Sequence, residues 1–300
     1  MYRTAIASVM TGVLSATLTT AGPSSYDAAA TEAWRTTRQQ QLASADGWLT
    51  VSGLYFLKPG RNTIGGDPSS DVVLPGGSSP AAAGVIEYTP PRGVALLLNP
   101  GVTASADKQT LTERFDLLSA AAGARRGSPR VSIGDATLQV HRSGERLAIR
   151  VRDPHSALLA TFTGLEWYRV DPAWAVPAKF VKYDAPRTLA TQNILGDNTE
   201  SVSTGEVEFT IGGARTRLVA FEEGDRLSFV FSDATGGKET YRIRFLSTPK
   251  PDAEGNLVID FNRAYNPPCA FNPYTTCPVP VPQNRLKVPI TAGEKAYKHR

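Results

Sequence analysis

The chain has 300 residues, of which 41% are hydrophobic and 20% charged, an ordinary balance for one large β domain or two smaller domains. Its 32 basic and 28 acidic residues give a net charge of +4, and the basic residues are dispersed along the chain. This pattern excludes a dense basic stripe, so no nucleic-acid partner is expected.

The N-terminal segment has the character of a secretory signal. Arg3 is followed by a run of apolar and small residues without acids, and Thr19 and Ala21 occupy the −3 and −1 positions of a cleavage site. Residues 1–21 therefore predict a signal peptide and an exported protein, periplasmic or extracellular, with a disordered or loosely helical N-terminus as the alternative. No later stretch approaches the roughly 20 apolar residues of a membrane span, so none is expected after cleavage.

A helix is expected next. Thr31 suits its cap, Gly47 its stop, and Trp34, Arg38 and Leu42 follow at spacings of four. Since these positions share one helix face, Trp34 and Leu42 are expected to pack against a sheet.

From residue 51 the pattern changes to short β-branched or alternating runs separated by Gly, Pro, Asn and Asp. In residues 136–153 apolar and polar residues alternate on either side of Ser143 and Gly144, which predicts a hairpin with one buried face. We assign residues 31–153 to the helix and a β-sandwich unit.

Residues 205–248 repeat this texture as four strands, the last with Tyr241, Ile243 and Phe245 on one face. Strands at such close spacing, without helices between them, predict a mostly β fold of sandwich or barrel type. We assign residues 154–300 to this second unit and a Pro-rich C-terminal clasp.

The clasp, residues 260–286, contains both cysteines, Cys269 and Cys277. An exported protein with two cysteines most often pairs them, so a disulfide is predicted. No metal is expected, because the three histidines fall on a strand, in a turn and at the C-terminus, and no cofactor is indicated.

The clasp also favours a binding site. Its prolines donate no N–H, so side-chain bonds and packing must order it, either as a clasp alone or as a clasp that also forms a pocket wall. The turn at residues 232–241 likewise suits either a plain hairpin or a polar site. We expect a small polar or amphipathic ligand where the second β unit meets the clasp. The candidate ligand-binding residues are Asp233, Thr235, Tyr241, Asp260, Asn262, Tyr265, Asn266, Tyr274, Asn284 and Arg285.

Whether the protein is an enzyme stays open. The sequence has no G-x-S-x-G elbow, H-E-x-x-H motif, P-loop or dinucleotide-binding glycine motif. The alternative is a hydrolase that uses Asp233, Asp260 or Arg285. Glu294 is a further carboxylate, although we expect it to form a surface pair with Lys295.

Several segments, chiefly DFNRAYNPPCAFNPYTTCPVPVPQNRLKVPITAGEK at residues 260–295, resemble a bacterial and archaeal family known as domain of unknown function 1684. That family has no established activity, so the resemblance implies no mechanism.

Residues 57–74, LKPGRNTIGGDPSSDVVL, resemble the opening strands of a forkhead-associated domain, a β-sandwich that binds phosphothreonine through its loops. That resemblance implies an interaction module as a third alternative. However, Gly66 stands where that family has an arginine, and the family's downstream Ser and His are absent.

Overall fold

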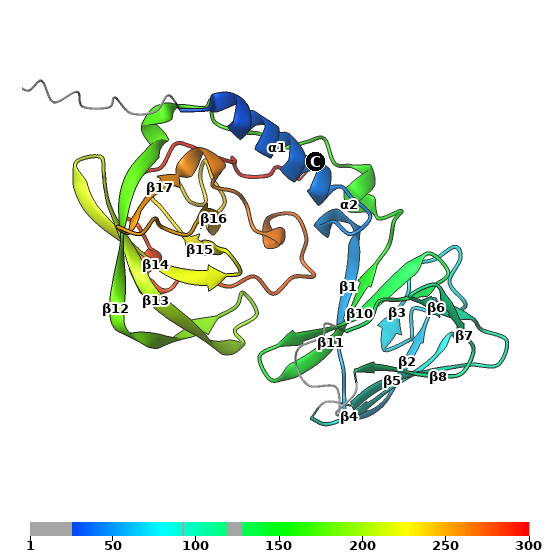
Figure 1. Cartoon of the computed structure of the whole chain (residues 1–300). Coiled ribbons are helices and arrows are strands. Elements are labelled where there is room, and N and C mark those ends of the chain that lie inside the picture. Colours follow the sequence, from blue (N-terminus) through cyan, green and yellow to red (C-terminus); the bar gives the residue numbers. More distant parts are fainter. Residues whose placement is uncertain (1–25, 92, 119–127, 300) are drawn as a thin grey trace, which may run out of the picture.

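The computed structural model describes residues 26–91, 93–118 and 128–299, so the predicted signal peptide lies outside the described residues. Two β-rich units follow the main helix along the chain (Figure 1). The predicted mostly β fold is confirmed, and the two units have separate hydrophobic clusters. Within these ranges no helix is long and apolar enough to cross a membrane.

The N-terminal unit is a sandwich of a six-stranded sheet, ordered β1-β11-β10-β9-β6-β7, and a five-stranded sheet, ordered β3-β2-β4-β5-β8. Alternating side chains of both sheets share one buried cluster. Hairpin β10–β11 turns at Gly144, whose φ of 56° suits glycine. The strands are β1 (Val51–Phe56), β2 (Gly60–Gly65), β3 (Val72–Val73), β4 (Gly84–Thr89), β5 (Gly93–Leu98), β6 (Ala104–Ala106), β7 (Gln109–Leu111), β8 (Arg114–Leu118), β9 (Val131–Ile133), β10 (Ala136–Ser143) and β11 (Arg146–Arg152).

The C-terminal unit is one antiparallel sheet, ordered β16-β15-β14-β13-β12-β17, that curls into a nearly closed barrel (Figure 1). The two end strands approach each other, and Thr248 Oγ1 donates to Val258 O at 2.9 Å. Buried phenylalanines, including Phe209, Phe229 and Phe231, fill the interior. The strands are β12 (Ala175–Gln192), β13 (Asn198–Ile211), β14 (Ala214–Glu223), β15 (Arg226–Phe231), β16 (Arg244–Pro249) and β17 (Asn256–Asp260).

The strand predicted around Tyr241 differs from the sequence expectation. It begins only at Arg244, which is fully buried and pairs with buried Asp233 at 2.9 Å. Leu246 is buried in the barrel core, whereas Phe245 lies on the other face against Tyr265. An inward-facing arginine thus takes a position that the apolar pattern alone would give to its neighbours.

Helix α1 (Ala28–Leu42) begins earlier than predicted. Asp27 is its N-cap and accepts from Ala30 N at 2.8 Å, so the expected cap, Thr31, lies inside the helix and is fully buried. The helix lies alongside the C-terminal unit, and a short helix, α2 (Ala157–Ala160), precedes that unit (Figure 1).

After β17 the chain continues through the 3₁₀ turns Phe261–Arg263, Pro268–Ala270 and Pro282–Asn284. Side-chain bonds order this segment, as expected; Asn272, for example, donates to the backbone of the N-terminal unit at Val51 O. The two cysteines lie close together, with the Cys269 amide 3.3 Å from Cys277 Sγ, but both are free thiols. The disulfide is therefore not shown and stays a prediction.

Candidate functional site: an arginine-lined cavity under helix α1

Three cavities adjoin one another at the C-terminal unit, and α1 lines two of them. The middle one, the arginine cavity, has a volume of about 280 Å³. It shares Arg38, Gln41 and Tyr265 with a cavity of about 500 Å³ on one side, and Arg226 and Arg263 with one of about 360 Å³ on the other. The arginine cavity is lined by Trp34, Arg38, Gln41, Arg226, Ser247, Arg263 and Tyr265.

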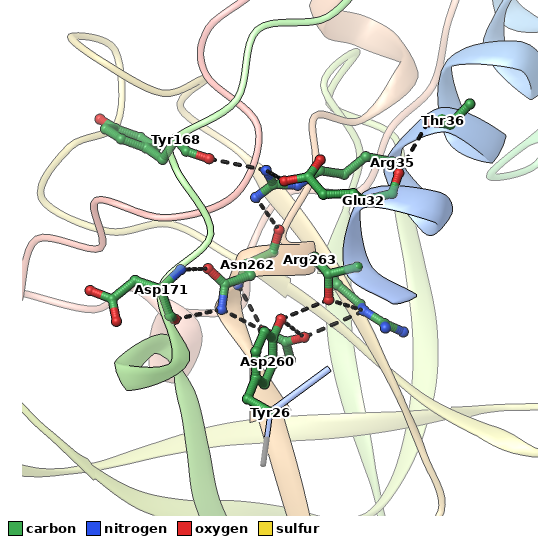
Figure 2. Close-up of polar contacts among 10 residues, drawn as sticks. Tyr26, Glu32, Arg35, Thr36, Tyr168, Asp171, Asp260, Asn262 and Arg263 are labelled. Atoms are coloured by element: carbon green, nitrogen blue, oxygen red, sulfur yellow. Dashed lines mark hydrogen bonds and ion pairs between the residues drawn. The ribbon is translucent and has the colours of Figure 1, made fainter. Parts of the chain in front are cut away.

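The helix contributes Trp34, Arg38 and Gln41 because spacings of four and three place them on one face. The next face anchors α1 to the barrel. Arg35, which is 5% exposed, donates to the carbonyls of Tyr168 and Asn262, each at 3.1 Å (Figure 2). Charge-assisted bonds to buried carbonyls fix the rotation of the helix, so the lining side chains are held in place.

Arg38 is fixed from behind by a buried carboxylate. Its Nε lies 2.8 Å from Glu294 Oε2, its Nη2 donates to Asn266 O at 2.7 Å, and its guanidinium stacks 4.3 Å from the Tyr265 ring centre. Glu294 is 1% exposed, so the expected surface pair with Lys295 is wrong. Burial raises the pKa of Glu294, and Arg38 partly opposes that rise.

The other two arginines are also held on one side. Arg263 Nε donates to Thr31 Oγ1 at 3.2 Å and lies 3.4 Å from Asp260 Oδ2 (Figure 2). Arg226 donates to Ser247 through Nε at 2.7 Å and Nη2 at 3.2 Å. These contacts orient the guanidinium groups without using all of their N–H donors.

The three lining arginines keep unused donors. Within the described residues, both terminal nitrogens of Arg263 and Nη1 of Arg226 and Arg38 make no hydrogen bond. Among the residues that the structure describes, no carboxylate lines the arginine cavity. Glu294 and Asp260 pair with two of the three arginines, Arg38 and Arg263. Glu223 is the cross-strand partner of Arg226 at the β14–β15 turn, and within the described residues the two side chains form no ion pair.

Tyr265 and Trp34 form the aromatic wall of the cavity, with ring centres 6.0 Å apart. Burial raises the pKa of Tyr265, and the Arg38 charge acts in the opposite direction. The cavity thus combines rigid cationic donors with two aromatic faces.

Comparisons with known proteins find a family model that matches part of the chain. Residues 160–295 match the family described as "Protein of unknown function (DUF1684)". The predicted family resemblance is therefore confirmed over this range. A solution NMR structure of an uncharacterized protein from Haloarcula marismortui is 28% identical, with a match that covers 45% of this chain and 78% of that chain at a TM-score of 0.39. No curated protein matches the chain.

The matched range contains all ten predicted ligand-binding residues, but the structure brings few of them to the cavities. Tyr265 lines the arginine cavity and Asp260 lines the adjoining 360 Å³ cavity. Tyr274 is 40% exposed and lines none of the three cavities. Arg285 also lies outside them and donates to Pro280 O at 3.4 Å. Tyr241 donates to Cys269 O at 3.1 Å.

The remaining predicted residues use their polar groups inside the fold. Asp233 pairs with Arg244 and accepts from Thr235 N at 2.8 Å. Asn262 donates to Asp171 O at 2.8 Å and so ties down the loop before β12 (Figure 2). Asn266 donates to Glu294, and Asn284 donates to the carbonyls of Val219 and Val230. These two asparagines are buried, as are Asp233, Thr235 and Asn262.

Sequence reasoning missed Arg38, Gln41, Arg226 and Ser247 as lining residues. The helical spacing of Trp34 and Arg38 was the only signal for them, and it did not identify what the helix would face. In the described ranges no cluster of three or more His, Cys, Asp or Glu residues suits a metal ion.

Proposed function

We propose that the protein binds a small ligand with an anionic group in the arginine cavity. The observation that carries this proposal is the convergence of three arginines, with free guanidinium N–H groups, on one cavity that no carboxylate lines. Planar guanidinium groups bind carboxylate, sulfonate and phosphate groups through paired charge-assisted hydrogen bonds.

The energetics support a bound anion. Arg38 is 17% exposed and Arg263 33% exposed, so their charges are partly desolvated, whereas Arg226 is exposed to solvent. An anion in the cavity would accept hydrogen bonds from the unused donors of these arginines. The aromatic faces of Trp34 and Tyr265 would exclude water and fix the orientation of the ligand.

Calorimetric titration with methanesulfonate, inorganic phosphate and citrate at low ionic strength tests the proposal. We expect binding that weakens as salt is added, because the interaction is ionic. Arg226→Gln keeps much of the side-chain volume and removes the charge, and we expect a 10-fold or greater loss of affinity, the effect of about 1.5–3 kcal/mol per charged hydrogen bond.

Arg215→Gln is the matched control, because Arg215 lies on the same sheet, is 73% exposed and pairs with Glu208 outside the cavity. It should bind like the wild type. The proposal fails if none of the three anions binds at millimolar concentration, or if Arg226→Gln and Arg215→Gln bind equally.

The other two functional hypotheses have less support. A carboxylate hydrolase needs acids in the cavity, and Asp233 is instead engaged by Arg244 in the barrel interior. For the phosphothreonine module, Gly66 lies under a loop: its amide donates to Pro80 O at 2.8 Å, and an added Cβ would approach Ser79 O at 3.2 Å. An arginine there would crowd this loop.

Export of the protein remains part of the proposal, on the strength of the sequence of residues 1–21. Expression of the full chain in a bacterium with periplasmic fractionation and mass measurement tests it. The expected product is periplasmic and shorter by the signal segment; a full-length cytoplasmic product contradicts export.

A further inference from the structure

Next to the arginine cavity lies a larger cavity of different character. It has a volume of about 500 Å³, and we call it the aromatic cavity. Leu42, Trp48, Phe245, Pro268 and Phe271 line it together with Tyr265, which both cavities share. The side chains come from α1, the turn after it, β16 and the C-terminal segment, so the cavity lies where four parts of the chain meet.

We propose that the ligand is an amphipathic acid, with its anionic head in the arginine cavity and an apolar tail in the aromatic cavity. This inference rests on the proposed function and names the chemical class of the ligand. The two cavities share Arg38, Gln41 and Tyr265, so one molecule can extend from one to the other past the Tyr265 ring.

The surroundings of the aromatic cavity suit a tail and not a second charge. Leu42 and Phe271 are buried at 4% and 0% exposure and form its apolar base. Asp46 is the one carboxylate in its lining, and Arg130 pairs with it. Burial of apolar surface is therefore the main interaction that this cavity offers.

The third cavity, on the other side, suits a tail less well, although Leu257 and Val258 also line it. Its lining includes Asp260, Lys250 and Arg226, and Asp260 is also bonded to Tyr26. A tail placed there would desolvate charged groups without replacing their hydrogen bonds. The tail is thus directed along α1 toward Leu42.

Titration with linear alkanesulfonates tests the inference, because the head stays ionised at every pH while the tail lengthens. Ethane-, butane-, hexane- and octanesulfonate are compared below their micelle concentrations. Each methylene that enters the cavity should raise affinity about three- to fourfold, and the gain should stop when the cavity is full.

Two variants locate the tail. Ser44 is exposed at the rim of the aromatic cavity, and Ser44→Trp places an indole there, so the gain per methylene should be lost. Thr36→Trp adds the same group on an exposed position of α1 outside the cavities and should keep the gain. Circular dichroism and melting temperature verify that both variants fold.

Tryptophan emission gives an independent readout, because Trp34 lines the arginine cavity and Trp48 the aromatic one. Octanesulfonate with a terminal bromine should quench the wild type and quench Trp48→Phe much less. Quenching that Trp48→Phe leaves unchanged contradicts the placement of the tail.

The outcomes separate the two proposals. If short and long sulfonates bind equally and Arg226→Gln weakens both, the arginine cavity binds anions and the tail inference is wrong. If affinity rises with chain length but Arg226→Gln has no effect, the tail site stands alone and the proposed anion site is wrong. If no sulfonate binds, both fail.

Discussion

Substitution of Asn284 tests most directly how the C-terminal segment contributes to the stability of the fold. Strands β14 and β15 pair from Phe221 opposite Ser228 outward to the turn. The same register continued by two residues would place Val219 opposite Val230, but the strands have separated there. The fully buried Asn284 side chain fills the opening: it donates to Val219 O at 3.0 Å and Val230 O at 3.1 Å and accepts from Val219 N at 2.7 Å.

Replacement of Asn284 by alanine removes all three bonds and leaves buried backbone groups unpaired. At about 1 kcal/mol net per hydrogen bond, Asn284→Ala should lower the free energy of unfolding by about 3 kcal/mol. Asn284→Asp keeps the acceptor but faces two carbonyls with a carboxylate, so it should destabilise the fold at least as much.

Urea unfolding of the folded chain measures both effects, and the midpoint should fall with an unchanged slope. Gln283→Ala is the control, because Gln283 lies in the same 3₁₀ turn and is exposed. Hydrogen exchange at the Val219 amide should accelerate in Asn284→Ala alone. If the free energies of unfolding of the two alanine variants differ by less than about 1 kcal/mol, Asn284 does not stabilise the separated ends of β14 and β15.

Three further predictions concern buried and paired charges, each measured by chemical unfolding. Asp233→Asn leaves the Arg244 guanidinium buried without its carboxylate and should cost about 3–5 kcal/mol. Burial raises the pKa of Glu294 in the folded chain, so the folded state holds that proton more tightly and wild-type stability should fall as pH rises through the folded pKa; Glu294→Gln should lack this fall. Arg146 lowers the pKa of Asp197 to about 2, so this contact should stabilise the fold above the ordinary aspartate pKa and lose its effect as pH drops toward 2. Asp197→Asn should remove that acid-side loss, and an unaltered profile would contradict the assignment.

The fold class could be predicted because local patterns determine it. Alternation on either side of Gly144 specified the hairpin β10–β11, and the change from helical to period-two spacing after Gly47 separated α1 from the sheets. The pattern failed at Arg244, since a charged residue gives no sign in sequence that Asp233, which lies in the preceding turn, will neutralise it in the core.

The candidate site was less accessible from sequence, for a physical reason. Tyr265 was identified because aromatic and polar residues crowd the segment around it. Arg226 and Arg38 join it only through tertiary contacts: Arg38 is 227 positions away along the chain, and its orientation depends on the buried Glu294. Local spacing carries no information on such long-range pairs, so it left open whether the polar residues of the clasp only order that segment or also form a pocket wall.

Helix α1 and the range that matches the family model together form the proposed binding cavity. Arg226, Ser247, Arg263 and Tyr265 lie inside the matched range 160–295, whereas Trp34, Arg38 and Gln41 come from the helix outside it. Without α1 the cavity would lose one of its three guanidinium groups and one aromatic wall, and Glu294 would lose its cationic partner. A chain that shares only the matched range therefore holds four of the seven lining residues, and the ligand binding that we propose here would require a helix that docks as α1 does.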